Sequence, residues 1–356
     1  MNNKKVYLTL QNGKTFVGKR FGANGESVGE LVFTTGVVGY VETLTDPSFY
    51  GQVVVQTFPT IGNYGVAPED AESDKAYLSA YVVREVCEIP SNFRSQGTLD
   101  DYLKKMGVIG VYGIDTRELT KIIRENGSMN VAITDKPLSD LSVLKTNTTA
   151  GALEKVSCKN VEYFGDENGV KVAVWDFGVK NSIIENLTKR GCRCIKVPYN
   201  TDADEILSLD VKGVVLSNGP GNPAENCSVI ENVKKVLGKV PVFGIGFGHQ
   251  LVALAMGGMT NKMERGHRGA NQPVKELSTG KTYTTSQNHG YDVVVSSIEK
   301  IAKVDYVSVN DGSCEGCEYK NVNAVTVQFD PTECGGARGT TFFYDNFVNT
   351  IKGGNN

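Results

Sequence analysis

The chain has 356 residues, of which 40% are apolar and 22% are charged, as in an ordinary globular protein that could form two domains. The 40 acidic and 37 basic side chains are mixed along the sequence, which excludes a basic surface for nucleic acid or anionic lipid. No apolar run approaches the ~20 residues that cross a bilayer, and the first residues lack a signal-peptide pattern. We therefore expect a cytosolic protein without a membrane partner.

Residues 1–137 are predicted to form a β-rich α/β domain. Two alternating runs flank Asn12 and Gly13, and this dipeptide is a strong signal for a β-hairpin. Thr98 and Asp115 each precede a helical pattern and are predicted to cap its N-terminus. The predicted strands and helices of this domain cover residues 5–22, 29–36, 52–58, 78–86, 98–107 and 115–127.

The polar, weakly periodic residues 138–168 are predicted to be a linker to a second domain at 169–356. There, short apolar strands alternate with amphipathic helices, which predicts right-handed crossovers and a parallel sheet covered on both faces. Functional groups of such sheets lie beyond the carboxyl ends of the strands. The alternating elements are predicted at 170–178, 181–191, 192–199, 202–209, 213–221, 225–238, 240–248 and 249–258.

The eight cysteines favour reduced thiols over disulfides, because the chain is long and shows no secretion signal. Cys314 and Cys317 have the spacing of metal ligands, but no second such pair exists and the chain has only three histidines. We therefore expect no metal site. Cys192 and Cys194 alternate, which predicts two small apolar side chains on one face of a strand.

The segment "PVFGIGFGHQLVALAMGG" predicts a strand, a sharp turn and a helix, the pattern of an elbow that holds a nucleophile at its apex. Gly246 occupies that apex. A dinucleotide-binding loop is the competing interpretation, since Gly244, Gly246 and Gly248 follow the strand. Its spacing requires a third glycine at position 249, where His249 stands, so we reject this interpretation.

Several longer motifs extend this comparison over nearly the whole chain. The first domain contains "TTGVVGYVETLTDPSFYGQ", "FPTIGNYG" and "YGIDTRELTKIIRENGSMN", and the second contains "SNGPGNP", "GIGFGHQLVALA", "GHRGANQPV" and "TSQNHGYDV". With these motifs the sequence resembles the small, glutamine amidotransferase subunit of carbamoyl phosphate synthetases. The first-domain motifs make the resemblance specific, because amidotransferases in general do not share them.

The resemblance implies an N-terminal β-rich α/β domain followed by a doubly wound, flavodoxin-like class I glutamine amidotransferase domain. In that family the small subunit hydrolyses glutamine with a Cys-His-Glu triad and passes ammonia to a large subunit. The large subunit makes carbamoyl phosphate for pyrimidine or arginine synthesis from ammonia, bicarbonate and ATP. The resemblance therefore implies a heterodimeric ligase complex with ATP and magnesium on the large subunit and no cofactor in this chain.

The sequence departs from the family at the triad. The family elbow reads Gly-Ile-Cys-Leu-Gly-His-Gln, and Gly246 stands at its cysteine; the family His-Pro-Glu is replaced by Asp330, Pro331 and Thr332. Glycine has no side chain that can attack, a carboxylate is a weak base at neutral pH, and threonine carries no charge to stabilise an imidazolium. We expect a glutaminase-deficient small subunit that supports or regulates a large subunit supplied with ammonia.

The alternative is an active glutamine-hydrolysing subunit in which other residues act. Cys334 could supply a thiol and Glu333 could shift into the place of Thr332, but that thiol lacks a nearby base. His249 and His289 belong to the ordinary family pattern. His267 and Arg268 fall in "GHRGANQPV", which we expect to support the fold.

The resemblance also places glutamine-binding positions that this chain retains. We expect this glutamine recess to persist, because backbone amides at the elbow and at Gly219 can form an anion hole without special side chains. Glutamine therefore remains a candidate ligand. The positions are Ser48, Gly219, Gly221, Phe247, Gln250, Asn288, Gly290 and Tyr291.

Overall fold

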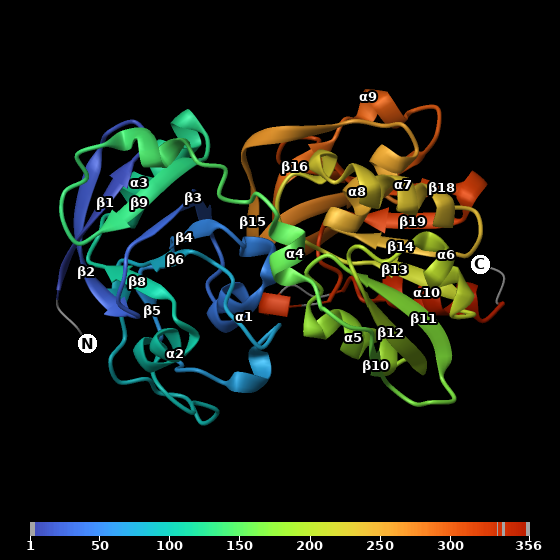
Figure 1. Cartoon of the computed structure of the whole chain (residues 1–356), viewed down its shortest axis with the longest axis horizontal. Coiled ribbons are helices and arrows are strands. Elements are labelled where there is room, and N and C mark those ends of the chain that lie inside the picture. The colour runs from blue at the N-terminus through green and yellow to red at the C-terminus, as the bar shows by residue number, and fades with distance from the viewer. Residues whose placement is uncertain (1–3, 333, 337–338, 354–356) are drawn as a thin grey trace. The chain divides into compact units, whose positions relative to one another are not determined.

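The computed structural model describes residues 4–332, 334–336 and 339–353. The chain divides into two compact units, Met1–Ala152 and Leu153–Asn356, and each is described by itself (Figure 1). The predicted α/β class, with a β-rich first domain and a doubly wound second domain, is confirmed. The segment predicted as a linker contains η3 (Leu141–Lys145), α4 (Ala152–Val156) and β10 (Glu162–Phe164).

The first unit is built around a closed barrel with the strand order β1-β2-β8-β6-β4-β3-β9. Its first two strands form the predicted antiparallel hairpin around Asn12 and Gly13. A separate two-stranded sheet pairs β5 (Thr60–Ile61) with β7 (Glu85–Val86). The barrel strands are β1 (Lys5–Leu10), β2 (Thr15–Gly22), β3 (Ser27–Thr34), β4 (Gln52–Gln56), β6 (Ala80–Val82), β8 (Ile109–Tyr112) and β9 (Met129–Thr134).

Alternating side chains of the barrel strands pack into two cores. Val53 and Val55 of β4 lie in one apolar cluster and Val54 lies in the other, because successive residues of a strand point to opposite faces. Thr98 Oγ1 accepts a hydrogen bond from the Asp101 amide at 3.2 Å, so the predicted cap is confirmed. The helical elements are α1 (Tyr40–Thr45), η1 (Pro47–Phe49), η2 (Pro68–Asp70), α2 (Leu99–Met106) and α3 (Thr116–Asn126), the last capped by Asp115.

The second unit contains one large mixed sheet with the order β10-β12-β11-β13-β14-β19-β18-β17-β15-β16. Its parallel part, β12-β11-β13-β14-β19, has the order 2-1-3-4-5 of flavodoxin-like folds. The strands after β10 are β11 (Val170–Asp176), β12 (Cys192–Pro198), β13 (Gly213–Leu216), β14 (Val242–Ile245), β15 (Thr260–Glu276), β16 (Thr282–Val293), β17 (Lys303–Ser308), β18 (Cys314–Tyr319) and β19 (Ala324–Val327).

Helices cover both faces of the parallel strands, as Figure 1 shows. Trp175 packs into the core beneath α6, α7 and α8, whereas Val174 packs into the core beneath α5 and α10. Cys192 and Cys194 are both buried in the latter core, which confirms their predicted common face. No helix in the described residues is long and apolar enough to span a bilayer. The helices are α5 (Asn181–Thr188), α6 (Ala203–Ser208), α7 (Cys227–Val236), α8 (Phe247–Ala255), α9 (Val295–Ile298) and α10 (Phe342–Ile351).

Candidate functional site

The predicted elbow lies between β14 and α8, at the carboxyl edge of the parallel strands. Gly246 at its apex has φ 58° and ψ −106°, a backbone conformation that a side chain would strain. Its amide donates to the Val327 carbonyl at 2.8 Å. A Cβ placed on Gly246 would find its nearest neighbours, atoms of Asn218 and Gln328, at 3.6–3.7 Å. The elbow therefore has its sharp turn and has room for a side chain, but bears none.

At two other glycines near the elbow, a backbone carbonyl of another segment lies where a side chain would begin. A Cβ on Gly248 would lie 2.3 Å from the Leu216 carbonyl oxygen, and one on Gly219 would lie 2.4 Å from the Phe177 carbonyl oxygen. Gly221 has φ +88°. Packing therefore requires glycine at positions 219 and 248, and the left-handed backbone favours glycine at position 221.

Asp330 is held by two neighbours through its two carboxylate oxygens. Lys180 Nζ donates to Oδ2, and the Thr332 amide and hydroxyl donate to Oδ1 at 2.8 and 2.5 Å. The side chains of Lys180 and Asp330 are only 7% and 16% exposed, so this is a largely buried ion pair. The Asp330 amide also donates to the Ser286 carbonyl at 2.8 Å. Asp330 is thus held by an ion pair with Lys180 and by hydrogen bonds from Thr332.

Part of the predicted glutamine recess is brought together by hydrogen bonds. Gln250 Nε2 donates to the carbonyl of Tyr291 and to Gln328 Oε1, both at 2.9 Å. Asn288 Nδ2 is buried and has no hydrogen-bond partner in the described part of the chain. A Cβ on Gly290 would lie 3.1 Å from a guanidinium nitrogen of Arg268. Asn288 of β16 therefore offers an available amide donor.

Two further residues of the predicted recess, Phe247 and Ser48, have contacts within their own units. Phe247 is 3% exposed and packs in the apolar core, with its ring centroid 5.9 Å from that of Phe177. Ser48 belongs to the first unit, where its amide donates to Asp46 Oδ1 at 2.8 Å. Phe247 therefore contributes its side chain to the core, and Ser48 is positioned by a local turn.

Sequence reasoning missed Lys180, which is 150 residues away from Asp330. The sequence signal that could have identified it is its place in the short loop between β11 and α5, at the edge where functional groups of such sheets lie. His249 is fully buried, and its Nδ1 lies 2.7 Å from Thr326 Oγ1, in keeping with a supporting role. Glu333 and the side chain of Cys334 lie outside the described part of the chain.

The thiols of Cys314 and Cys317 lie side by side in the core. Their Sγ atoms are 3.3 Å apart, and both residues are buried. Within the described residues, no group of three metal-ligating side chains includes either thiol. The CxxC spacing thus places two thiols side by side.

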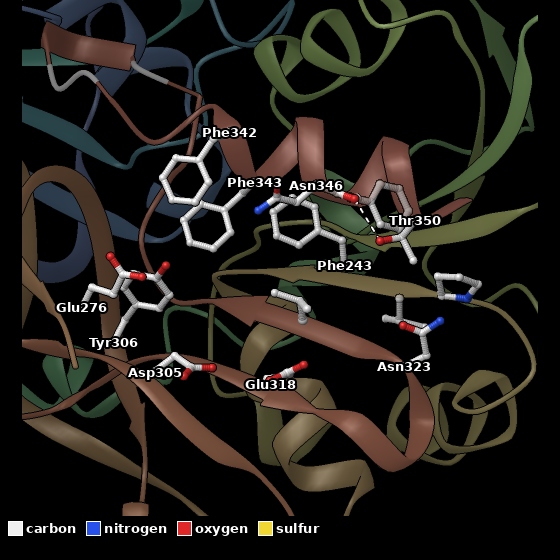
Figure 2. A pocket seen from close by; sticks show the side chains of 14 residues that line it. Phe243, Glu276, Asp305, Tyr306, Glu318, Asn323, Phe342, Phe343, Asn346 and Thr350 are labelled. Carbon is white, nitrogen blue, oxygen red and sulfur yellow. Dashed lines mark hydrogen bonds between the residues drawn. The ribbon is translucent and has the colours of Figure 1, made fainter. Parts of the chain in front are cut away.

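A separate cavity of about 270 Å³ lies beside α10 (Figure 2). The rings of Phe342 and Phe343 form one side, and the carboxylates of Glu276, Asp305 and Glu318 line another. Its lining includes the residues that begin β14 and precede β19, so it lies toward the amino ends of the parallel strands. None of the predicted site residues lines it.

Comparisons with known proteins cover both units. The family "Carbamoyl-phosphate synthase small chain, CPSase domain" matches residues 8–133, and "Glutamine amidotransferase class-I" matches residues 173–350. The chain is 44% identical to the carbamoyl phosphate synthase small chain of Clostridium perfringens, over 97% of this chain and 99% of that protein. It is 45% identical to the carbamoyl phosphate synthase pyrimidine-specific small chain of Bacillus subtilis, over 98% and 96%.

Proposed function

Because this chain belongs to the family of carbamoyl phosphate synthase small chains, we propose that it is a small subunit that does not hydrolyse glutamine itself. In this role it pairs with a large subunit and supports or regulates the synthesis of carbamoyl phosphate from ammonia, bicarbonate and ATP. The large subunit would hold ATP and magnesium.

The absence of a side chain at Gly246 carries this proposal. Amide hydrolysis by a triad needs a side-chain atom that attacks the carbonyl carbon, and the elbow offers only backbone at its apex. The elbow has room for a Cβ, so its geometry supports a loss of the nucleophile rather than a loss of the turn.

The residues at the other two triad positions support the same proposal. A general base must be free to accept a proton from the nucleophile. Both oxygens of Asp330 already accept hydrogen bonds, one set from Thr332 and one from Lys180. Asp330 is therefore engaged by Lys180 and Thr332 rather than by a nucleophile at the elbow.

Glutamine binding does not require the triad, and we propose that it persists. Asn288 Nδ2 is a buried donor without a partner in the described residues, and a bound amide or carboxylate oxygen would satisfy it. Gln250 and Tyr291 are fixed beside each other by a hydrogen bond. A small subunit that senses glutamine without consuming it is compatible with these contacts.

The test uses the complex of this chain with the large subunit from the same organism. We expect carbamoyl phosphate from ammonium, bicarbonate and ATP, and none above background when glutamine replaces ammonium. The large subunit alone is the control for what this chain contributes. Synthesis from low glutamine at a rate equal to that from ammonium would establish the alternative, an active amidotransferase subunit.

A further inference from the structure

A buried cluster of metal-ligating side chains joins β15, β16 and β18. His267 of β15 lies opposite His289 of β16 in the strand register, and Glu315 comes from β18. His267 and His289 are each 8% exposed, and Glu315 is fully buried. One ligand atom from each of the three lies within 4.8 Å of the other two. The proposed function uses none of these side chains.

The Nε2 atom of His267, on the side of the ring away from Glu315, is hydrogen-bonded to a carboxylate. Its Nε2 lies 2.8 Å from Asp311 Oδ2, and Asp311 also accepts hydrogen bonds from the Ser313 amide and hydroxyl. With the Nε2 proton donated to Asp311, the Nδ1 side of the ring, 3.3 Å from Glu315 Oε1, is the side that can take a cation.

His289 is oriented in the same manner by a backbone carbonyl. Its Nδ1 lies 2.9 Å from the Tyr291 carbonyl oxygen, which can only accept, so Nδ1 carries the proton. The Nε2 lone pair then points inward, 3.9 Å from Glu315 Oε1.

Gln287 adds a fourth inward acceptor. Its Nε2 donates to Thr285 Oγ1 at 3.1 Å and to Glu315 Oε2 at 3.0 Å, so its carbonyl Oε1 is turned the other way. That oxygen lies 3.2 Å from His289 Nε2. Two lone pairs that face each other at this distance repel unless a proton or a cation lies between them.

We propose that this cluster binds one divalent metal ion of the zinc class. His267 Nδ1, His289 Nε2 and Glu315 Oε1 are its ligands, and Gln287 Oε1 completes a four-atom set. Ligands of a tetrahedral zinc at 2.0–2.2 Å lie about 3.4 Å from one another. Three separations between these atoms, 3.2, 3.3 and 3.9 Å, bracket that value.

The surroundings match those of known zinc sites in two further ways. Imidazole with carboxylate is a donor set that zinc accepts, and the outer ring nitrogens of its histidines are commonly held by a carboxylate or a backbone carbonyl. Asp311 and the Tyr291 carbonyl occupy those two places. In the described part of the chain, the ion-pair partners of Asp311 and Glu315 are imidazoles only. A divalent cation would therefore balance both carboxylates.

The experiment titrates zinc into the full-length chain after treatment with a chelator, with calorimetry and elemental analysis as readouts. We expect one zinc ion per chain and a raised thermal midpoint. Asp311→Asn should weaken zinc binding by about 10- to 100-fold, as outer partners of metal ligands do, and Glu315→Gln and His267→Ala should weaken it further. Glu315→Gln preserves the side-chain shape, which keeps the test valid if His267→Ala fails to fold.

The neighbouring thiols provide the matched control. Cys314→Ser combined with Cys317→Ser removes the two neighbouring thiols, and this variant should still bind one zinc ion with unchanged affinity. The proposal is overturned if the wild-type chain binds no zinc, if the thiol variant loses the zinc, or if Glu315→Gln and His267→Ala bind it as the wild type does. In each case protons, and not a metal ion, would lie between the ring nitrogens of His267 and His289 and the oxygens of Glu315 and Gln287.

Discussion

At the scale of single residues, Gly246 and Gly248 show two different reasons for a glycine. Gly246 has a backbone conformation that would strain any residue with a side chain, but there is open space where its Cβ would lie. At Gly248 a Cβ would collide with a backbone oxygen. The sequence pattern predicted the elbow that contains both. It could not separate the two roles, because the space at each glycine depends on Leu216 of β13 and on Gln328 after β19, which are distant in the sequence.

The first prediction compares side chains introduced at these two glycines. Gly246→Cys should fold with a free energy of unfolding lower by about 1–3 kcal/mol, the cost of a sparsely populated backbone conformation. Gly248→Ala should lose more, because its Cβ would lie 2.3 Å from a backbone oxygen. Urea unfolding measures both variants. Equal losses would contradict the distinction drawn from the structure.

The second prediction concerns the buried ion pair. Asp330→Asn leaves Lys180 largely buried without its carboxylate, and such a loss costs about 3–5 kcal/mol. Lys180→Met in the same chain should recover much of this loss, because an apolar side chain needs no partner. A double-mutant cycle by urea unfolding gives the coupling energy. Additive effects of the two substitutions would show that the pair contributes nothing.

The third prediction concerns the return of hydrolysis. Members of a triad act as a unit, and the loss of one costs on the order of 10⁶ in rate, so Gly246→Cys alone should release no ammonia from glutamine. Gly246→Cys, Asp330→His and Thr332→Glu together supply nucleophile, base and orienting carboxylate and should give measurable glutaminase. Ammonia release is the readout. Full activity of the single variant would show that the base has been assigned to the wrong residue.

At the scale of helices and strands, local signals predicted the caps and the hairpin correctly. Thr98, Asp115 and the Asn12-Gly13 turn act through neighbours within a few residues, so a sequence suffices to identify them. The antiparallel strands β15 and β16 were not predicted. Their pairing has register shifts between Lys262 and His267 and between Gly269 and Gln272, and these breaks disturb the alternation that identifies a strand.

The fourth prediction concerns Asp100 in the first turn of α2. Its carboxylate accepts from the Gly22 amide at 2.7 Å and from Lys104 Nζ at 2.6 Å. Burial acts to raise the pKa of Asp100, but the hydrogen bonds from Lys104 and Gly22 outweigh it and lower the pKa. The ionised carboxylate therefore stabilises the fold above its unfolded pKa of about 3.9, and this contribution disappears as the pH falls through the lowered folded value.

Urea unfolding of Asp100→Asn at several pH values measures this contribution. The variant should be less stable than the wild type by about 1–3 kcal/mol at pH 7, and the difference should shrink below pH 4. Asp101→Asn is the matched control, since the neighbouring Asp101 side chain is 73% exposed and should show a far smaller change. A difference for Asp100→Asn that is constant from pH 7 to pH 2 would contradict the assignment.

At the scale of the whole molecule, the order of the sheet brings together residues that are distant in the sequence. The alternation of strands and helices predicted the carboxyl edge on which Gly246, Gly219 and Asp330 lie. It could not predict the partner of Asp330, because Lys180 is reached only when β11 and β19 take their places in one sheet. The buried histidine cluster was missed for the same reason.

The fifth prediction links glutamine binding to global stability. A ligand that binds only the folded chain stabilises it by about 2.7 kcal/mol when present at 100 times its dissociation constant. Glutamine at high concentration should therefore raise the thermal midpoint of the wild type. Asn288→Ala, which removes the available Nδ2 donor, should reduce this shift, while leaving the midpoint without glutamine nearly unchanged. No shift for the wild type would indicate that the recess does not bind glutamine.

The pair of Lys180 and Asp330 has a further consequence for motion. Lys180 follows β11 and Asp330 follows β19, and the strands β13 and β14 lie between those two in the sheet. This ion pair therefore connects the start of α5 to the segment after β19, past the ends of the two intervening strands. Local opening of either segment must break this ion pair, so amide hydrogen exchange should become faster in both segments of Lys180→Met. In the wild type, exchange in these segments should change little with moderate salt, which screens buried charges weakly.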